Sequence, residues 1–164
     1  MKDALKYIAI VIIVAIVAYF VMPQSAKANL TGRVQMLINE DAKNVIPVIQ
    51  NAGIIGHETV TYKQALEKMT TNYSWVYSED SKADGTSTQK VTFQGSKAQF
   101  TFGGDAAEAV LKNYTLKMEF IVTPVQNSYE YNLNVYLDGS LQNDERKEAI
   151  LQQLYNKYIG DAKE

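Results

Sequence analysis

Two stretches of alternating apolar and polar residues decide the fold: Tyr114–Val122 reads YTLKMEFIV, and Tyr129–Leu137 reads YEYNLNVYL. In each stretch every second residue is apolar, which is the period of a β-strand that buries one face. The segment Pro124–Ser128 joins the two stretches. They therefore predict an antiparallel hairpin with one apolar face.

The register of this hairpin follows from keeping its apolar side chains on one face. Phe120 is predicted to pair with Tyr131, and Met118 with Leu133. A slip by one residue would turn the asparagines of the second strand into the core, so the hydrophobic pattern excludes it.

Shorter patterns around the hairpin predict the remaining elements. Further strands are expected at Ser74–Glu79, Lys90–Gln94 and Ala98–Phe102, with a turn at Gly95-Ser96. Helices are expected at Leu30–Asn44, Thr61–Tyr73, Ala106–Lys112 and Asn143–Ile159, the last capped by Gly160. The predicted fold class is α+β: an N-terminal apolar helix, then an antiparallel sheet of about five strands with helices packed on one face.

The run Ile8–Met22 (IAIVIIVAIVAYFVM) contains no charged residue and ends at Pro23. It is shorter than the roughly 20 residues of a spanning helix, which favours a cleaved signal peptide, and Ala26-Lys27-Ala28 is a small-x-small site of the kind that signal peptidase accepts. A retained anchor is equally open, because the apolar residues Ala4 and Leu5 precede the run and could extend it. In a retained helix the residues expected to meet the membrane are Ile8, Val11, Ile12, Ala15, Ile16, Tyr19, Phe20 and Met22.

The first 28 residues and the rest of the chain carry net charges of opposite sign. The first 28 residues hold three lysines against one aspartate, a net charge of +2, so the rest of the chain carries −4. A positive N-terminal end favours an orientation with the remainder outside the cytoplasm. We therefore predict a signal peptide or membrane anchor at residues 1–28, an amphipathic helix and connector at 29–59, and an extracytoplasmic α+β domain at 60–164.

Composition excludes several classes of chemistry. The 164 residues include no cysteine and one histidine, which excludes disulfides, thiolate metal sites and multi-histidine centres. His57 is the lone histidine and is expected in a loop. The segment Asp80–Gly85 resembles the start of a calcium loop, but Lys82 and Val91 occupy positions that need oxygen ligands. No cofactor, no metal, no nucleic-acid partner and no enzymatic activity are expected.

Two partial resemblances bear on the function. Val17–Gln24 (VAYFVMPQ), followed by the stretch Leu30–Asn44, is similar to the stem of type IV pilins, where an apolar helix ends in Pro-Gln and continues into an amphipathic half. The chain differs from pilins in having no glycine before a processing point and in carrying Lys6 where they have glutamate. The resemblance implies a filament subunit.

Residues 60–158 resemble small extracytoplasmic domains of bacterial envelope proteins. The shared order of features is a helix, a tryptophan, a Val-x-Phe-x-Gly motif, a strand pair and a terminal helix. Here these five features are Thr61–Met69, Trp75, Val91–Gly95, Met118–Leu137 and Leu151–Tyr158, with Gly139–Gln142 joining the last two. The resemblance implies a location outside the cytoplasm and a binding role.

The sequence thus predicts a non-enzymatic binding or assembly protein of the bacterial cell envelope, exported or anchored in the inner membrane. Its partners would be the membrane, through a retained N-terminal helix, and other envelope proteins or itself. The expected partner face is the outer side of the sheet, around Lys117, Ile121, Asn134 and Tyr136. A pilin-like filament subunit is the alternative, and a small enzyme using Asp, Glu or Tyr in a cleft is the third hypothesis.

Overall fold

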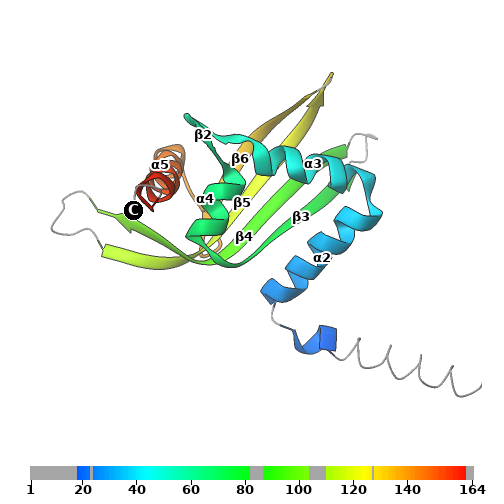
Figure 1. Ribbon diagram of the computed structural model, residues 1–164, viewed down its shortest axis with the longest axis horizontal. Coiled ribbons are helices and arrows are strands. Elements are labelled where there is room, and N and C mark those ends of the chain that lie inside the picture. Colours follow the sequence, from blue (N-terminus) through cyan, green and yellow to red (C-terminus); the bar gives the residue numbers. More distant parts are fainter. Residues whose placement is uncertain (1–17, 23, 82–86, 104–109, 127, 162–164) are drawn as a thin grey trace, which may run out of the picture.

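The computed structural model of the chain describes residues 18–22, 24–81, 87–103, 110–126 and 128–161. Its elements are α2 (Gln24–Ile38), α3 (Glu40–Asn51), β1 (Gly53–Ile54), β2 (His57–Thr61), α4 (Tyr62–Met69), β3 (Thr71–Ser81), β4 (Ser87–Phe102), β5 (Val110–Val125), β6 (Ser128–Leu137), β7 (Ser140–Leu141) and α5 (Asp144–Asp161). Figure 1 shows their arrangement.

The main sheet has five strands in the order β3-β4-β5-β6-β7, so every strand pairs with its neighbour along the chain. All of these pairings are antiparallel. Strands β1 and β2 form a separate two-stranded sheet. The α+β class and the antiparallel sheet of about five strands are therefore confirmed.

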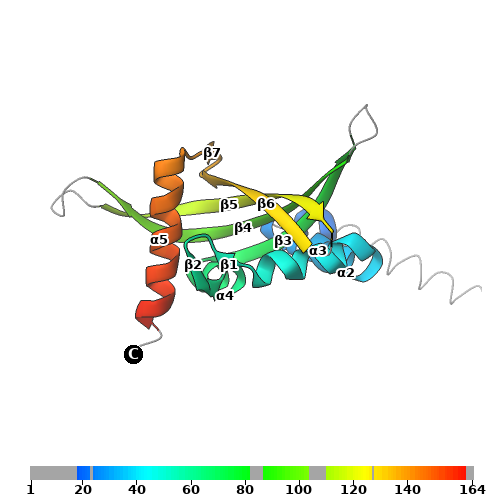
Figure 2. The same cartoon turned by 90° about the horizontal axis from the view of Figure 1, so that it is seen from above.

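The core lies between the helices and one face of the sheet. Helices α3 and α4 pack on that face, and α5 runs across the long strands β4 and β5 next to α4 (Figures 1 and 2). The largest fully buried side chains come from both layers: Tyr62, Phe93, Phe100, Phe120, Ile46, Ile49, Ile54, Leu66, Leu116, Met118, Ile150 and Leu154. Burial of these apolar groups is the main force that holds the layers together.

Helix α4 begins at the predicted capping box. The Thr61 hydroxyl accepts a hydrogen bond from the Gln64 backbone at 3.3 Å, and the Gln64 side chain accepts one from the Thr61 backbone at 3.0 Å. The predicted apolar side of the helix is buried. The helix ends at Met69 rather than at Tyr73, because the chain enters β3 at Thr71.

The helix predicted at Leu30–Asn44 was placed wrongly: the break falls at Asn39, and Pro47 lies inside α3. The Asn39 side chain accepts a hydrogen bond from the Ala42 backbone at 2.9 Å and so begins a new helix there. Proline costs the helix one backbone hydrogen bond. The buried face that α3 packs against the sheet, Ala42, Val45, Ile46 and Ile49, offsets this cost.

The predicted hairpin is present, but its register differs by two residues. Phe120 pairs with Leu133, and Met118 pairs with Val135. The strands continue to Val125 and Ser128, so the turn is shorter than predicted. A shift of two residues keeps every side chain on its face, which is why hydrophobic alternation could not distinguish the two registers.

Strand β4 is continuous where two strands and a turn were predicted. The pairing with β5 shifts between Gly95 and Ala98, a bulge that gives Lys97 a φ of 58°. A side chain at Gly95 would meet Thr70 at 2.5 Å, so glycine allows β4 to approach the junction between α4 and β3. Val110–Lys112, predicted as the end of a helix, begins β5, and the rest of that predicted helix lies outside the described residues.

The C-terminal helix α5 begins as predicted. The Asn143 side chain accepts a hydrogen bond from the Arg146 backbone at 2.9 Å. Gly160 lies inside the helix instead of capping it, since α5 continues to Asp161. The apolar stripe is confirmed, with Ile150, Leu151 and Leu154 in the core.

The apolar N-terminal helix is not seen as a long element, because most of Ile8–Met22 lies outside the described residues. The part that is described begins at residue 18, and residues 18–21 are helical. Among the described residues, no helix has both the length and the apolar character needed to cross a bilayer.

Two glutamine side chains bind exposed strand edges. Gln35 of α2 donates to the Tyr77 carbonyl at 2.8 Å and accepts from the Tyr77 N–H at 3.1 Å, on the free edge of β3. Gln153 of α5 donates to the Thr101 carbonyl at 3.0 Å and accepts from the Thr101 N–H at 2.9 Å. Thr101 lies where β4 extends beyond its pairing with β3. Each amide replaces a strand neighbour, so α2 and α5 are fixed to the sheet by its own hydrogen-bonding pattern.

Candidate functional site

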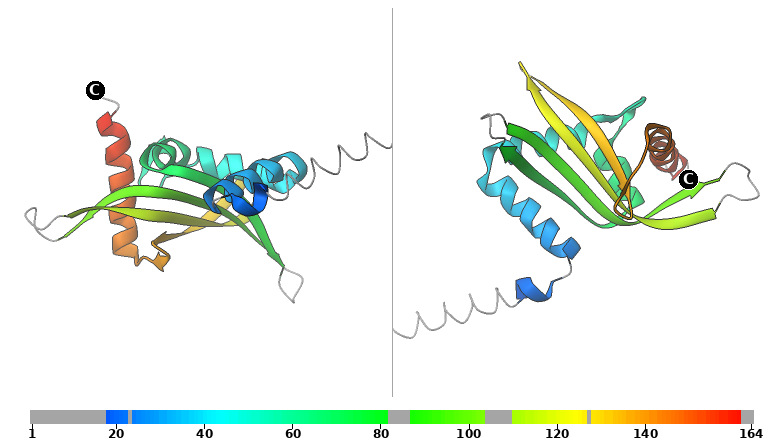
Figure 3. Two further views of the ribbon diagram at one scale, coloured as in Figure 1. Left: turned by 90° about the horizontal axis from the view of Figure 1, so that it is seen from below. Right: turned by 180° about the vertical axis from the view of Figure 1, so that it is seen from behind.

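The face of the sheet opposite α3 and α4 is the candidate site, and we call it the outer face. The views in Figure 3 show that no described helix lies over its centre. Along β5 the alternation of the strand directs Lys117, Glu119 and Ile121 to this side, while Met118 and Phe120 point into the core. All three outward side chains are partly exposed.

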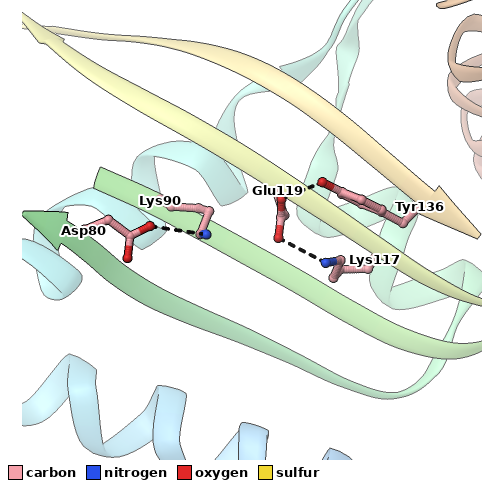
Figure 4. Close-up of polar contacts among 5 residues, drawn as sticks. All are labelled: Asp80, Lys90, Lys117, Glu119 and Tyr136. Atoms are coloured by element: carbon pink, nitrogen blue, oxygen red, sulfur yellow. Dashed lines mark hydrogen bonds and ion pairs between the residues drawn. The ribbon is translucent and has the colours of Figure 1, made fainter. Parts of the chain in front are cut away.

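A three-residue polar network occupies the centre of the outer face (Figure 4). The Lys117 ammonium lies 3.1 Å from Glu119 Oε1, and the Tyr136 hydroxyl donates to Glu119 Oε2 at 2.9 Å. The same ammonium lies 4.0 Å from the centre of the Tyr136 ring. Lys117 and Tyr136 are direct partners across β5 and β6, so strand register brings the three groups together.

A second ion pair lies farther along the same face. Lys90 Nζ is 3.6 Å from Asp80 Oδ2, and the Asp80 side chain is 71% exposed. An exposed pair of this length contributes little to stability. The Glu119 side chain, by contrast, is only 16% exposed, so the central network is better shielded from water than the second ion pair.

The pKa values of Glu119 and Tyr136 are shifted in directions that do not suit acid–base catalysis near neutral pH. Partial burial acts to raise the pKa of Glu119, but hydrogen bonds from Lys117 and Tyr136, together with the nearby positive charges, lower that pKa below its ordinary value. The bond to Glu119, with partial burial, raises the pKa of the Tyr136 phenol. At neutral pH, Glu119 is therefore a carboxylate and Tyr136 a neutral phenol.

Four residues were predicted as the partner face, and the structure places them all on the outer face. Tyr136 and Lys117 form one cross-strand pair, and Asn134 lies opposite Glu119. Ile121 is partly exposed beside Lys90. Sequence reasoning missed Glu119, the residue that joins the network, because the predicted register set Lys117 opposite Asn134 rather than Tyr136. The sequence did hold a signal for Glu119: it lies two residues after Lys117 in the same strand, so the two side chains share one face.

The remaining candidates serve other roles or lie elsewhere. His57 begins β2 rather than occupying a loop, and its ring stacks on Tyr155 of α5 with centres 4.2 Å apart. The calcium-like segment lies partly outside the described residues. The described residues contain no group of three or more His, Cys, Asp or Glu side chains that could hold a metal ion.

The predicted membrane-facing residues fall into two groups. Ile8, Val11, Ile12, Ala15 and Ile16 lie outside the described residues. Tyr19, Phe20 and Met22 are described, and their side chains are exposed, Phe20 at 73%.

A hollow of about 470 Å³ lies where α5 begins, at the end of β4. Arg146 covers the Phe102 ring there, with 4.1 Å between the guanidinium carbon and the ring centre. Among the described residues that line the hollow, Glu145 is the one carboxylate.

Comparison of the chain with protein-family models, with curated proteins and with solved structures gives no match.

Proposed function

We propose that this chain is a non-enzymatic binding or assembly protein of the bacterial cell envelope, held at the membrane by its N-terminal segment, and that its outer sheet face receives a partner protein. The observation that carries the proposal is the ordered network of Lys117, Glu119 and Tyr136 on a sheet face that no described helix covers. Side chains that are already fixed lose little conformational freedom on binding.

The chemistry of the outer face favours a protein partner. Its centre combines Tyr136 and Ile121 with amide side chains from Gln94, Asn132 and Asn134. Tyrosine is enriched in protein–protein interfaces because its ring supplies contact area and its hydroxyl a hydrogen bond. Lys90 and Lys117 are each paired with a carboxylate, so neither of these described lysines offers the unpaired cation that binds nucleic acid.

The ionisation of the same groups supports binding over catalysis. A general acid near neutral pH needs a carboxyl whose pKa is raised, and a nucleophilic tyrosine needs a phenol whose pKa is lowered. Glu119 and Tyr136 are shifted in the opposite directions.

Site-directed photocrosslinking tests the proposal. The chain contains no cysteine, so a single substitution places one unique thiol. Asn134→Cys puts that thiol on the outer face, and Glu148→Cys puts it on the exposed side of α5 as a matched control. Each full-length variant would be labelled with a thiol-reactive photocrosslinker and returned to cell envelopes.

We expect Asn134→Cys to form a discrete adduct with another envelope protein, or with a second copy of the chain, that Glu148→Cys does not form. Loss of the adduct when Tyr136→Ala is added would assign it to the network. Absence of any adduct, or the same adducts from both thiols, would contradict the proposal.

A further inference from the structure

One side of helix α2 packs on the sheet, and the opposite side is apolar but exposed. One side contacts β3, where Gly32 packs against the Trp75 carbonyl and Gln35 bonds to Tyr77. Figure 1 shows the helix lying along that edge of the sheet. The opposite side carries four large aliphatic residues that are exposed: Leu30 at 43%, Val34 at 43%, Leu37 at 83% and Ile38 at 79%. We call these four residues the α2 stripe.

The α2 stripe is unusual for a free surface. Its members recur at spacings of four, three and one residues, which gathers them on one side of a helix. Exposed aliphatic residues gathered in this way mark a surface that another apolar phase covers.

The charge of α2 indicates what that phase is. The helix contains Lys27 and Arg33 and no acidic residue, although the chain as a whole is negative. A helix with an apolar stripe and basic flanks is typical of segments that lie in the interface of a bilayer with anionic lipids.

The residues before α2 extend the same apolar surface. Phe20 and Val21 are 73% and 79% exposed, and the Lys27 ammonium donates to the Phe20 carbonyl at 3.2 Å. A hollow of about 310 Å³, lined by Met22, Ala26, Leu30 and Arg33, lies between this segment and the stripe. An apolar hollow with an arginine in its lining suits an acyl chain with a phosphate group above it.

A second copy of the chain fits the stripe less well. A second copy would add another Lys27 and Arg33, and no acidic residue of α2, to the same surface, and like charges repel. Four aliphatic side chains also offer much less than the roughly 800 Å² per partner of a stable protein interface.

We propose that α2 lies in the membrane interface, with the α2 stripe among the acyl chains and Lys27 and Arg33 near anionic phosphates. This inference rests on the proposed membrane location, and it adds an orientation. The β3 edge of the sheet would lie next to the bilayer, and the outer face would stand at a fixed angle to it.

Spin-label accessibility tests the inference in full-length protein reconstituted into vesicles of phosphatidylcholine and phosphatidylglycerol. Leu37→Cys places a nitroxide on the stripe, and Lys43→Cys places one on the exposed side of α3 as the control. We expect the Leu37 label to collide several-fold more often with oxygen than with a water-soluble nickel chelate, and the Lys43 label to show the reverse. The preference at Leu37 should weaken in vesicles of phosphatidylcholine alone.

Three results would overturn the inference, and they separate it from the proposed function. If the protein floats with the vesicles but both labels report water, α2 does not lie in the interface although the membrane location stands. If strong spin–spin broadening appears at Leu37 with no oxygen preference, a second copy covers the stripe. If the protein does not float with the vesicles, the membrane location itself is wrong, and the inference falls with it.

Discussion

Glu119 is the residue on which the network of the outer face depends. It is the shared acceptor for Lys117 and Tyr136, and its side chain is mostly shielded from water. A carboxylate that accepts two hydrogen bonds has its pKa lowered in the folded state, as here. The stability that it contributes is therefore present above the ordinary glutamate pKa and is lost as the pH falls through the folded value.

We expect Glu119→Gln to lower the free energy of unfolding by about 1 kcal/mol at pH 7, because the amide cannot accept from both partners as a charged group. At a pH below the lowered pKa of Glu119 the wild-type side chain is protonated as well, so the difference should shrink. Urea denaturation at both pH values measures this, with the exposed Glu148→Gln as control. An equal difference at the two pH values would show that the charge of Glu119 plays no part.

At the scale of the elements, the two glutamine contacts explain how helices fix the sheet. The Gln35 amide uses both its donor and its acceptor on Tyr77, as a neighbouring strand would. A strand edge left open would otherwise pair with other chains. The Gln35 side chain and the close approach at Gly32 therefore help to fix the position of α2, and with it the α2 stripe, together with the packing of Met36 against the core.

Gln35→Glu should separate this role from simple packing. The carboxylate keeps the size of the side chain but has no N–H to donate, so it would face the Tyr77 carbonyl with like polarity. We predict a loss of about 1–3 kcal/mol in the free energy of unfolding and faster hydrogen exchange at the Tyr77 amide. Gln152→Glu, on the exposed side of α5, is the control. Unchanged exchange at Tyr77 would contradict the edge-binding role.

The elements also show how far the sequence predicts the structure. The capping box of α4 and the alternation of β5 and β6 are local signals, and both are confirmed. The break at Asn39 and the retained Pro47 depend on how α3 packs, and the bulge after Gly95 depends on contact with Thr70. Such decisions are made by tertiary contacts, which a single sequence does not display.

The candidate site was likewise predictable where it depends on local pattern and not where it depends on tertiary contacts. Strand period placed Lys117 and Tyr136 on one face, but only the register made them partners. The register depends on the position of the turn, which the apolar pattern leaves free by steps of two residues. The edge contacts of Gln35 and Gln153 had no sequence signal, because a glutamine that binds a distant strand looks like any surface glutamine.

At the scale of the whole molecule, the parts form a one-sided arrangement. Helices cover one face of the sheet, α2 occupies its β3 edge, and no described helix covers the outer face with its polar network (Figures 1 and 3). The N-terminal segment enters at the same edge through residues 18–22. In the proposed account, the membrane orients the domain and the outer face receives its partner.

The central claim of this account is that the domain is held at a membrane and faces away from the cytoplasm. Labelling of full-length Glu148→Cys in intact spheroplasts, with a maleimide that does not cross membranes, tests it most directly, because the thiol is unique and exposed. The account predicts that the protein stays with the membrane fraction after a salt wash and is labelled without lysis. Labelling that occurs only after lysis, with the protein in the soluble fraction, would contradict it.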